Sequence, residues 1–74
     1  MFNDYVARKT GDLYLLVNIK TNEIMEIDFI ISKCVQYVQN KGCFDASVFA
    51  MQNGLSLDEV NELWNEIINA LGDE

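Results

Sequence analysis

The strongest structural signal in this sequence is a capped amphipathic helix near its C-terminal end. Ser56 and Glu59 have the S-x-x-E spacing of a capping box, and Leu55 and Val60 are placed as the accompanying hydrophobic staple. The helix runs to Gly72 and carries apolar residues at helical spacing: Leu57, Val60, Leu63, Trp64, Ile67, Ile68 and Leu71. These side chains cover roughly 140° of the helical wheel, whereas a helix packed on one layer needs about 100°. Either two earlier helices cover this stripe, or part of it is left to contact something else.

Three short strands are predicted before the helices, at residues 5–8, 13–19 and 24–27. Loop-type residues at 20–23 separate the second strand from the third, so we expect an antiparallel meander. Alternate residues of the second strand form an unbroken apolar row that is expected to face the core: Leu13, Leu15, Val17 and Ile19. Leu16 and its alternate neighbours are then expected on the opposite face.

Two further helices are predicted between the third strand and the capped helix. Asp28 is expected to cap a helix over residues 29–40, its side chain accepting from free amides, and Gly42 can take the left-handed conformation that ends it. The apolar positions of this helix are Ile30, Ile31, Cys34, Val35 and Val38. Asp45 is expected to cap a shorter helix that ends at Gly54. The apolar positions of that shorter helix are Val48, Phe49 and Met51.

These elements predict one small α+β domain over residues 1–74, a three-stranded antiparallel β-meander followed by three α-helices in a winged helix-turn-helix-like order. The chain has 74 residues, of which 50% are hydrophobic, so it can build one core and has no room for a second domain. Histidine is absent, and the two cysteines, Cys34 and Cys43, form no C-x-x-C pair. We therefore expect reduced thiols, no metal site and no cofactor, in a soluble cytoplasmic protein.

Charge is distributed unevenly along the chain. The formal net charge is −7, yet all five cations lie before Gly42, and seven of the twelve acids lie after it. This C-terminal acidic field repels phosphate backbones, which argues against nucleic-acid binding, and attracts basic peptides or protein surfaces. Without histidine, a nucleophile in a catalytic context or a glycine-rich phosphate loop, no class of enzymatic reaction is indicated.

Several segments resemble the PqqD-like family, the peptide-recognition domains associated with enzymes that modify ribosomally made peptides. Leu13–Asn18 is similar to the family's central "vLL" strand, and Glu26–Asp28 to its "x-L-N" junction into the first helix. Ile31, Cys34 and Val35 fall where its "A-x-x-I-L" core triplet falls, and residues 59–67 resemble its "D-V-x-x-F-L-x-x-L" third helix. The resemblance extends over about residues 5–72.

The resemblance implies a protein that binds the leader segment of a precursor peptide by β-strand addition and presents it to a modifying enzyme, often a radical S-adenosylmethionine enzyme, without catalysing the reaction itself. The leader would pair with the third strand and insert apolar side chains toward the third helix. The expected peptide-binding residues are Ile24, Met25, Glu26, Ile27, Val60, Leu63, Trp64 and Ile67. Trp64 is the preferred anchor, although a lone tryptophan on a helical stripe is more often core. Glu59 and Glu66 are expected either to meet basic leader residues or to be a solvated face.

Two other functions remain open at this point. A winged helix-turn-helix transcriptional regulator is the alternative reading of the same element order, but residues 56–72 contain no Lys or Arg to contact bases or phosphates. A homodimer through the same strand edge is compatible with peptide binding.

Overall fold

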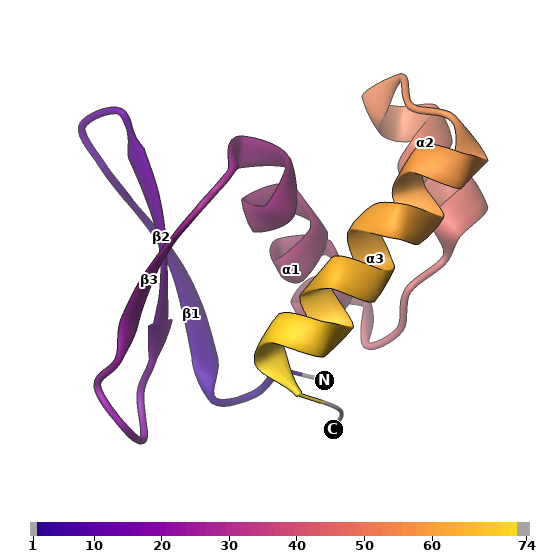
Figure 1. Ribbon diagram of the computed structural model, residues 1–74. Helices are drawn as coiled ribbons and strands as arrows, with labels where there is room; N and C mark the ends of the chain where they lie inside the picture. Colours follow the sequence, from indigo (N-terminus) through magenta and orange to yellow (C-terminus); the bar gives the residue numbers. More distant parts are fainter. Residues whose placement is uncertain (1, 73–74) are drawn as a thin grey trace.

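The computed structural model describes residues 2–72 and consists of a three-stranded sheet followed by three helices (Figure 1). The elements in chain order are β1 (Tyr5–Thr10), β2 (Leu13–Asn18), β3 (Ile24–Ile27), α1 (Phe29–Lys41), α2 (Ala46–Asn53) and α3 (Leu57–Leu71). The predicted α+β fold is therefore confirmed. Its expected boundaries shift slightly, since β1 extends to Thr10, β2 ends before Ile19 and α1 reaches Lys41. Across the described chain, no helix has both the length and the apolar character needed to cross a membrane.

The sheet has the strand order β1-β2-β3 with both pairs antiparallel, so β2 is central and β3 is an edge strand. All three helices lie on one side of it, as Figure 1 shows. The register aligns Ala7 with Leu16 and Leu16 with Met25, and it aligns Arg8 with Leu15 and Leu15 with Glu26. Residues paired across a sheet share a face, so the first row faces the helices and the second row lies on the outer face.

Leu16 is the residue of β2 that enters the core. It is 1% exposed, whereas Leu13 is 49% and Ile19 is 55% exposed. The prediction that Leu13, Leu15, Val17 and Ile19 face the core is therefore wrong, and this row lies on the outer face. Both faces of β2 carry apolar residues, so alternation alone could not identify the buried one. Tertiary packing determines which face of β2 is buried, because the helices attach on the side of Leu16.

The core lies between the sheet and the three helices. Its buried apolar residues are Phe2, Leu16, Cys34, Val35, Val38, Phe49, Ala50, Val60, Ile67 and Leu71. Gln39 of α1 ties the N-terminal segment to this core, since its side-chain amide donates to the carbonyl oxygens of Phe2 at 2.9 Å and Tyr5 at 2.7 Å. Phe2 is thereby held in the core although it precedes the first strand.

Local capping fixes the starts of α2 and α3. The Ser56 hydroxyl accepts from the Glu59 amide at 3.1 Å, and the Glu59 carboxylate accepts from the Ser56 amide at 2.9 Å, which completes the predicted capping box. Asp45 accepts from the Val48 amide at 3.2 Å, as predicted. Between the two helices, Gly54 takes a left-handed conformation with φ of 67°, which ends α2 and allows a tight turn.

Two details of the helix predictions are wrong. Asp28 occupies the N-cap position of α1, but its side chain makes no capping hydrogen bond, and the residue is exposed. The first helical bond uses its main chain instead, from the Ser32 amide to the Asp28 carbonyl oxygen at 3.0 Å. In α2, Met51 is 80% exposed, since the helix meets the core through the consecutive residues Phe49 and Ala50.

Candidate functional site

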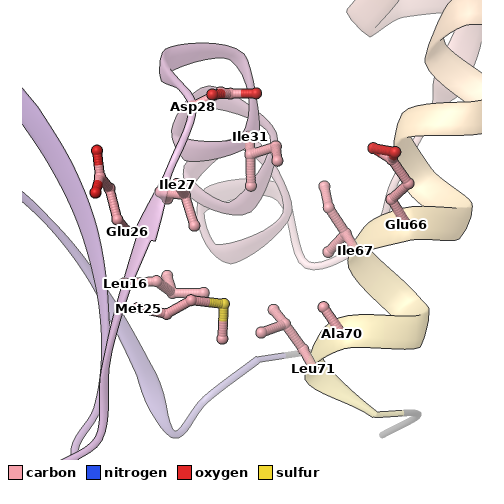
Figure 2. Close-up of a pocket in the computed structure, with 10 residues that line it drawn as sticks. All are labelled: Leu16, Met25, Glu26, Ile27, Asp28, Ile31, Glu66, Ile67, Ala70 and Leu71. Atoms are coloured by element: carbon pink, nitrogen blue, oxygen red, sulfur yellow. The ribbon is translucent and has the colours of Figure 1, made fainter.

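An apolar groove lies between the edge strand β3 and the C-terminal half of α3. It has a volume of about 220 Å³ and is open to solvent on one side. Its lining residues come from the sheet, the start of α1 and α3: Leu16, Met25, Glu26, Ile27, Asp28, Ile31, Glu66, Ile67, Ala70 and Leu71. Figure 2 shows Met25 and Ile27 pointing from β3 toward Ile67 and Leu71 of α3. The groove is thus bounded by a strand edge on one side and a helix on the other.

The main chain of β3 has hydrogen-bonding groups along its outer edge, beside this groove. The Asn18 amide donates to the Glu23 carbonyl oxygen at 2.8 Å, so Asn18 and Glu23 form a hydrogen-bonded pair. Along an antiparallel ladder, hydrogen-bonded pairs alternate with pairs that are not hydrogen-bonded. By this alternation, Met25 and Ile27 direct their N–H and C=O groups toward β2. Ile24 and Glu26 direct theirs outward. Within residues 2–72, no strand pairs with this outer side of β3.

The floor of the groove belongs to the core and its walls are partly exposed. Leu16 is 1%, Ile67 2% and Leu71 7% exposed, so these three side chains are held rigidly by packing. Met25 is 38% exposed and is the large apolar side chain of the walls that is most open to solvent. Its unbranched thioether can change rotamer to fit different neighbours. The groove therefore combines a fixed floor with one adaptable wall.

The charged side chains at the groove are all acidic. Glu26, Asp28 and Glu66 are among its lining residues, and none of these residues is Lys or Arg. In Figure 2 the carboxylates of Asp28 and Glu66 lie at one end of the groove, while Glu26 points away from the helices on the other face of the strand. The groove thus has an apolar middle and one negatively charged end.

The structure brings together half of the residues expected from the sequence to bind a peptide. Met25, Glu26, Ile27, Ile67 and Glu66 all line the groove. Sequence reasoning missed the remaining lining residues: Leu16, Asp28, Ile31, Ala70 and Leu71. Those on α3 could have been found, since residues 66, 67, 70 and 71 share one face of a helix by their spacing. The face that meets β3 is that of the last turns of α3 rather than its middle.

Other expected residues lie outside the groove. Val60 is fully buried in the core, and Leu63 packs against the core cluster. Trp64 stacks on Phe44 with ring centroids 4.2 Å apart and planes 6° from parallel, and it lies 5.7 Å from the Phe2 ring. Ile24 is 65% exposed and shares the outer sheet face with Val17.

Glu59 lies in the capping box at the opposite end of α3 from the groove. Hydrogen bonding to the Ser56 backbone amide, and then to the Ser56 side chain, lowers the pKa of the Glu59 carboxyl below the ordinary value of 4.5. These bonds occupy the carboxylate within its own helix terminus. Glu66 is therefore the acidic residue of the expected pair that the fold brings to the groove.

Cys34 is a buried ionisable residue that lies outside the groove. Burial raises the pKa of the Cys34 thiol to about 12, so this cysteine stays protonated and acts as a small core residue. Within the described range, no three His, Cys, Asp or Glu side chains cluster closely enough to hold a metal ion. Comparisons with models of protein families, with curated proteins and with solved structures each find no match.

Proposed function

We propose that this protein binds the leader segment of a ribosomally synthesised precursor peptide and presents that peptide to a modifying enzyme, such as a radical S-adenosylmethionine enzyme. One observation carries the proposal: an apolar groove lies directly beside the unpaired edge of β3. An extended chain placed there would find main-chain partners and side-chain pockets together, which is the arrangement that peptide recognition by strand addition uses.

The open main-chain groups of Ile24 and Glu26 would fix the register of the bound segment. Because side chains alternate along a strand, every second residue of the peptide would point toward α3. Those residues would pack over the floor that includes Leu16 and Leu71, beside the wall formed by Met25. Affinity would come mainly from the backbone ladder, and selectivity from the apolar residues that fit the groove.

The size of the groove favours a polypeptide over a small molecule. Its volume of about 220 Å³ is below the roughly 300–1,000 Å³ of pockets that enclose drug-sized ligands. A groove that is open along one side and apolar in its middle suits a few side chains of a longer chain. The remainder of that chain stays outside and remains accessible to an enzyme.

The acidic end of the groove favours a leader with a basic residue. Asp28 and Glu66 would attract a Lys or Arg side chain that follows the apolar residues along the bound strand. In this role the protein supplies no catalytic group, because the enzyme partner performs the chemistry. The role belongs in the cytoplasm, where precursor peptides are synthesised and where Cys34 and Cys43 would stay reduced.

The test is amide hydrogen exchange, followed by NMR, with and without a peptide selected from a displayed library of random sequences. Strand addition predicts that the amides of Ile24 and Glu26, which face outward, become protected when the peptide binds. The amides of Met25 and Ile27 are already bonded to β2 and should change little. Protection confined to α3 or α1, with no change at Ile24 and Glu26, would exclude strand addition at this edge.

A further inference from the structure

The outer face of the sheet carries apolar residues, and no helix of residues 2–72 covers them. Figure 1 shows all the helices on the opposite side of the sheet. Val6, Val17 and Ile24 form one row across the three strands, and Ile24 is 65% exposed. Leu15 stands at the centre of the next row, and Leu13 continues beyond it, 49% exposed. A contiguous apolar face of this kind is typical of a protein interface.

Two opposite charges flank this face in one row. The register places Arg8 on β1 and Glu26 on β3, with Leu15 between them on β2. Both charged side chains are exposed, and within residues 2–72 neither forms a salt bridge. A row with a cation at one edge, an apolar centre and an anion at the other edge is complementary to its own copy after rotation.

We infer that this outer face binds a second copy of the chain, with the two sheets packed face to face around a two-fold axis parallel to β2. Such an axis places β1 of one copy over β3 of the other, so Arg8 meets the partner's Glu26 at both ends of the row. Val6 then meets the partner's Ile24, and Leu15 meets the partner's Leu15. Sheets packed about 10 Å apart bring these long side chains within reach of each other.

The charges favour this axis over a two-fold axis that lies in the same plane between the sheets but runs perpendicular to the strands. An axis perpendicular to the strands would place Arg8 over the partner's Arg8 and Glu26 over the partner's Glu26, and like charges oppose that arrangement. The inferred dimer leaves the helices and the groove free, so it does not depend on the proposed function.

The dimer should be weak, because the face is small. Strand spacing and rise give a three-stranded face of this length a footprint of roughly 300 Å² per copy. A standard stable interface buries about 800 Å² per partner. We therefore expect half-association at roughly 0.1–1 mM protein.

Sedimentation equilibrium over a range of concentrations up to the millimolar level tests this inference. Wild type should show a monomer–dimer equilibrium, and Val17→Lys should remain monomeric because two lysines would meet near the axis. Met51→Lys, on the exposed side of α2, introduces the same charge elsewhere and should dimerise as wild type does. A wild-type protein that stays monomeric, or a dimer unaffected by Val17→Lys, overturns the inference.

A charge exchange tests the geometry and still applies if Val17→Lys fails to fold. Arg8→Glu and Glu26→Arg should each weaken the dimer about tenfold, since each puts like charges opposite one another. The double variant should recover most of the wild-type dimerisation, because it restores opposite charges at both ends of the row. A double variant no better than the single ones overturns the two-fold arrangement.

Discussion

Trp64 joins aromatic side chains that lie far apart in the sequence. It stacks on Phe44, which precedes α2, and approaches Phe2 at the start of the described chain. Phe44 also lies 5.7 Å from the Phe49 ring, so Trp64 belongs to an aromatic cluster whose members do not line the groove. Its main role at this scale is packing.

Replacing Trp64 by Ala should therefore reduce stability more than peptide affinity. Loss of a large packed aromatic side chain costs about 3 kcal/mol, a large share of the roughly 5 kcal/mol expected for a small domain. Urea denaturation measures the loss, and Trp64→Phe is the control that keeps an aromatic ring beside Phe44. An unchanged free energy of unfolding combined with a large loss of peptide affinity would show instead that Trp64 contacts the ligand.

Cys34 provides a pH-dependent test of core packing. Burial raises the pKa of its thiol from 9.0 to about 12 in the folded protein. Because the folded pKa lies above the unfolded one, the associated stability is fully present below about pH 9 and is lost as the pH rises toward 12. The free energy of unfolding should thus fall more steeply above pH 9 in wild type than in Cys34→Ala. Parallel pH profiles of the two proteins would contradict burial of the thiol.

The edge strand β3 is the element on which the proposed function depends, and proline substitutions can separate its two sides. Glu26→Pro removes an outward amide that no strand of the described chain uses, so folding should be nearly unchanged while peptide binding weakens at least about tenfold. Met25→Pro removes an amide that faces β2 and should reduce stability by about 3 kcal/mol. Circular dichroism and peptide titration of both variants check this difference. Wild-type affinity in Glu26→Pro would remove strand addition from consideration.

The helices and the sheet differ in how far local sequence determined them. Capping residues such as Ser56 and Asp45 act within one turn, so the starts of α3 and α2 followed from the sequence. The buried face of β2 did not, because Leu15 and Leu16 are equally apolar and only the attachment of the helices distinguishes them. Met25, Glu26 and Ile27 of β3 line the groove, but its other wall lies farther along α3 than Leu63 and Trp64. Phe44 and Phe2 occupy the side of the helix that bears Trp64, and no local pattern reveals such a contact.

At the scale of the whole molecule, the net charge of −7 and the local charge of the groove would make separate contributions to the proposed peptide binding. A general negative field raises the rate at which any basic partner arrives and is screened by salt within about 10 Å at moderate ionic strength. In the proposed complex, contacts at Asp28 and Glu66 would instead act on a particular basic residue of the bound peptide. Both effects make affinity fall with salt, so salt dependence alone does not distinguish them.

Two charge-matched double variants make that distinction. Asp28→Asn with Glu66→Gln, and Asp12→Asn with Glu62→Gln, each remove one Asp and one Glu charge from the same total of twelve acids. The first pair lines the groove, whereas Asp12 and Glu62 are exposed residues outside it. If a lysine of the peptide sits between Asp28 and Glu66, only the first variant should lose affinity, by about fivefold at moderate salt, the equivalent of about 1 kcal/mol for partly exposed ion pairs. Calorimetric titration with one lysine-containing peptide measures the affinities of both double variants. Equal losses would mean that the whole charge attracts the peptide and that the groove end adds no contact of its own.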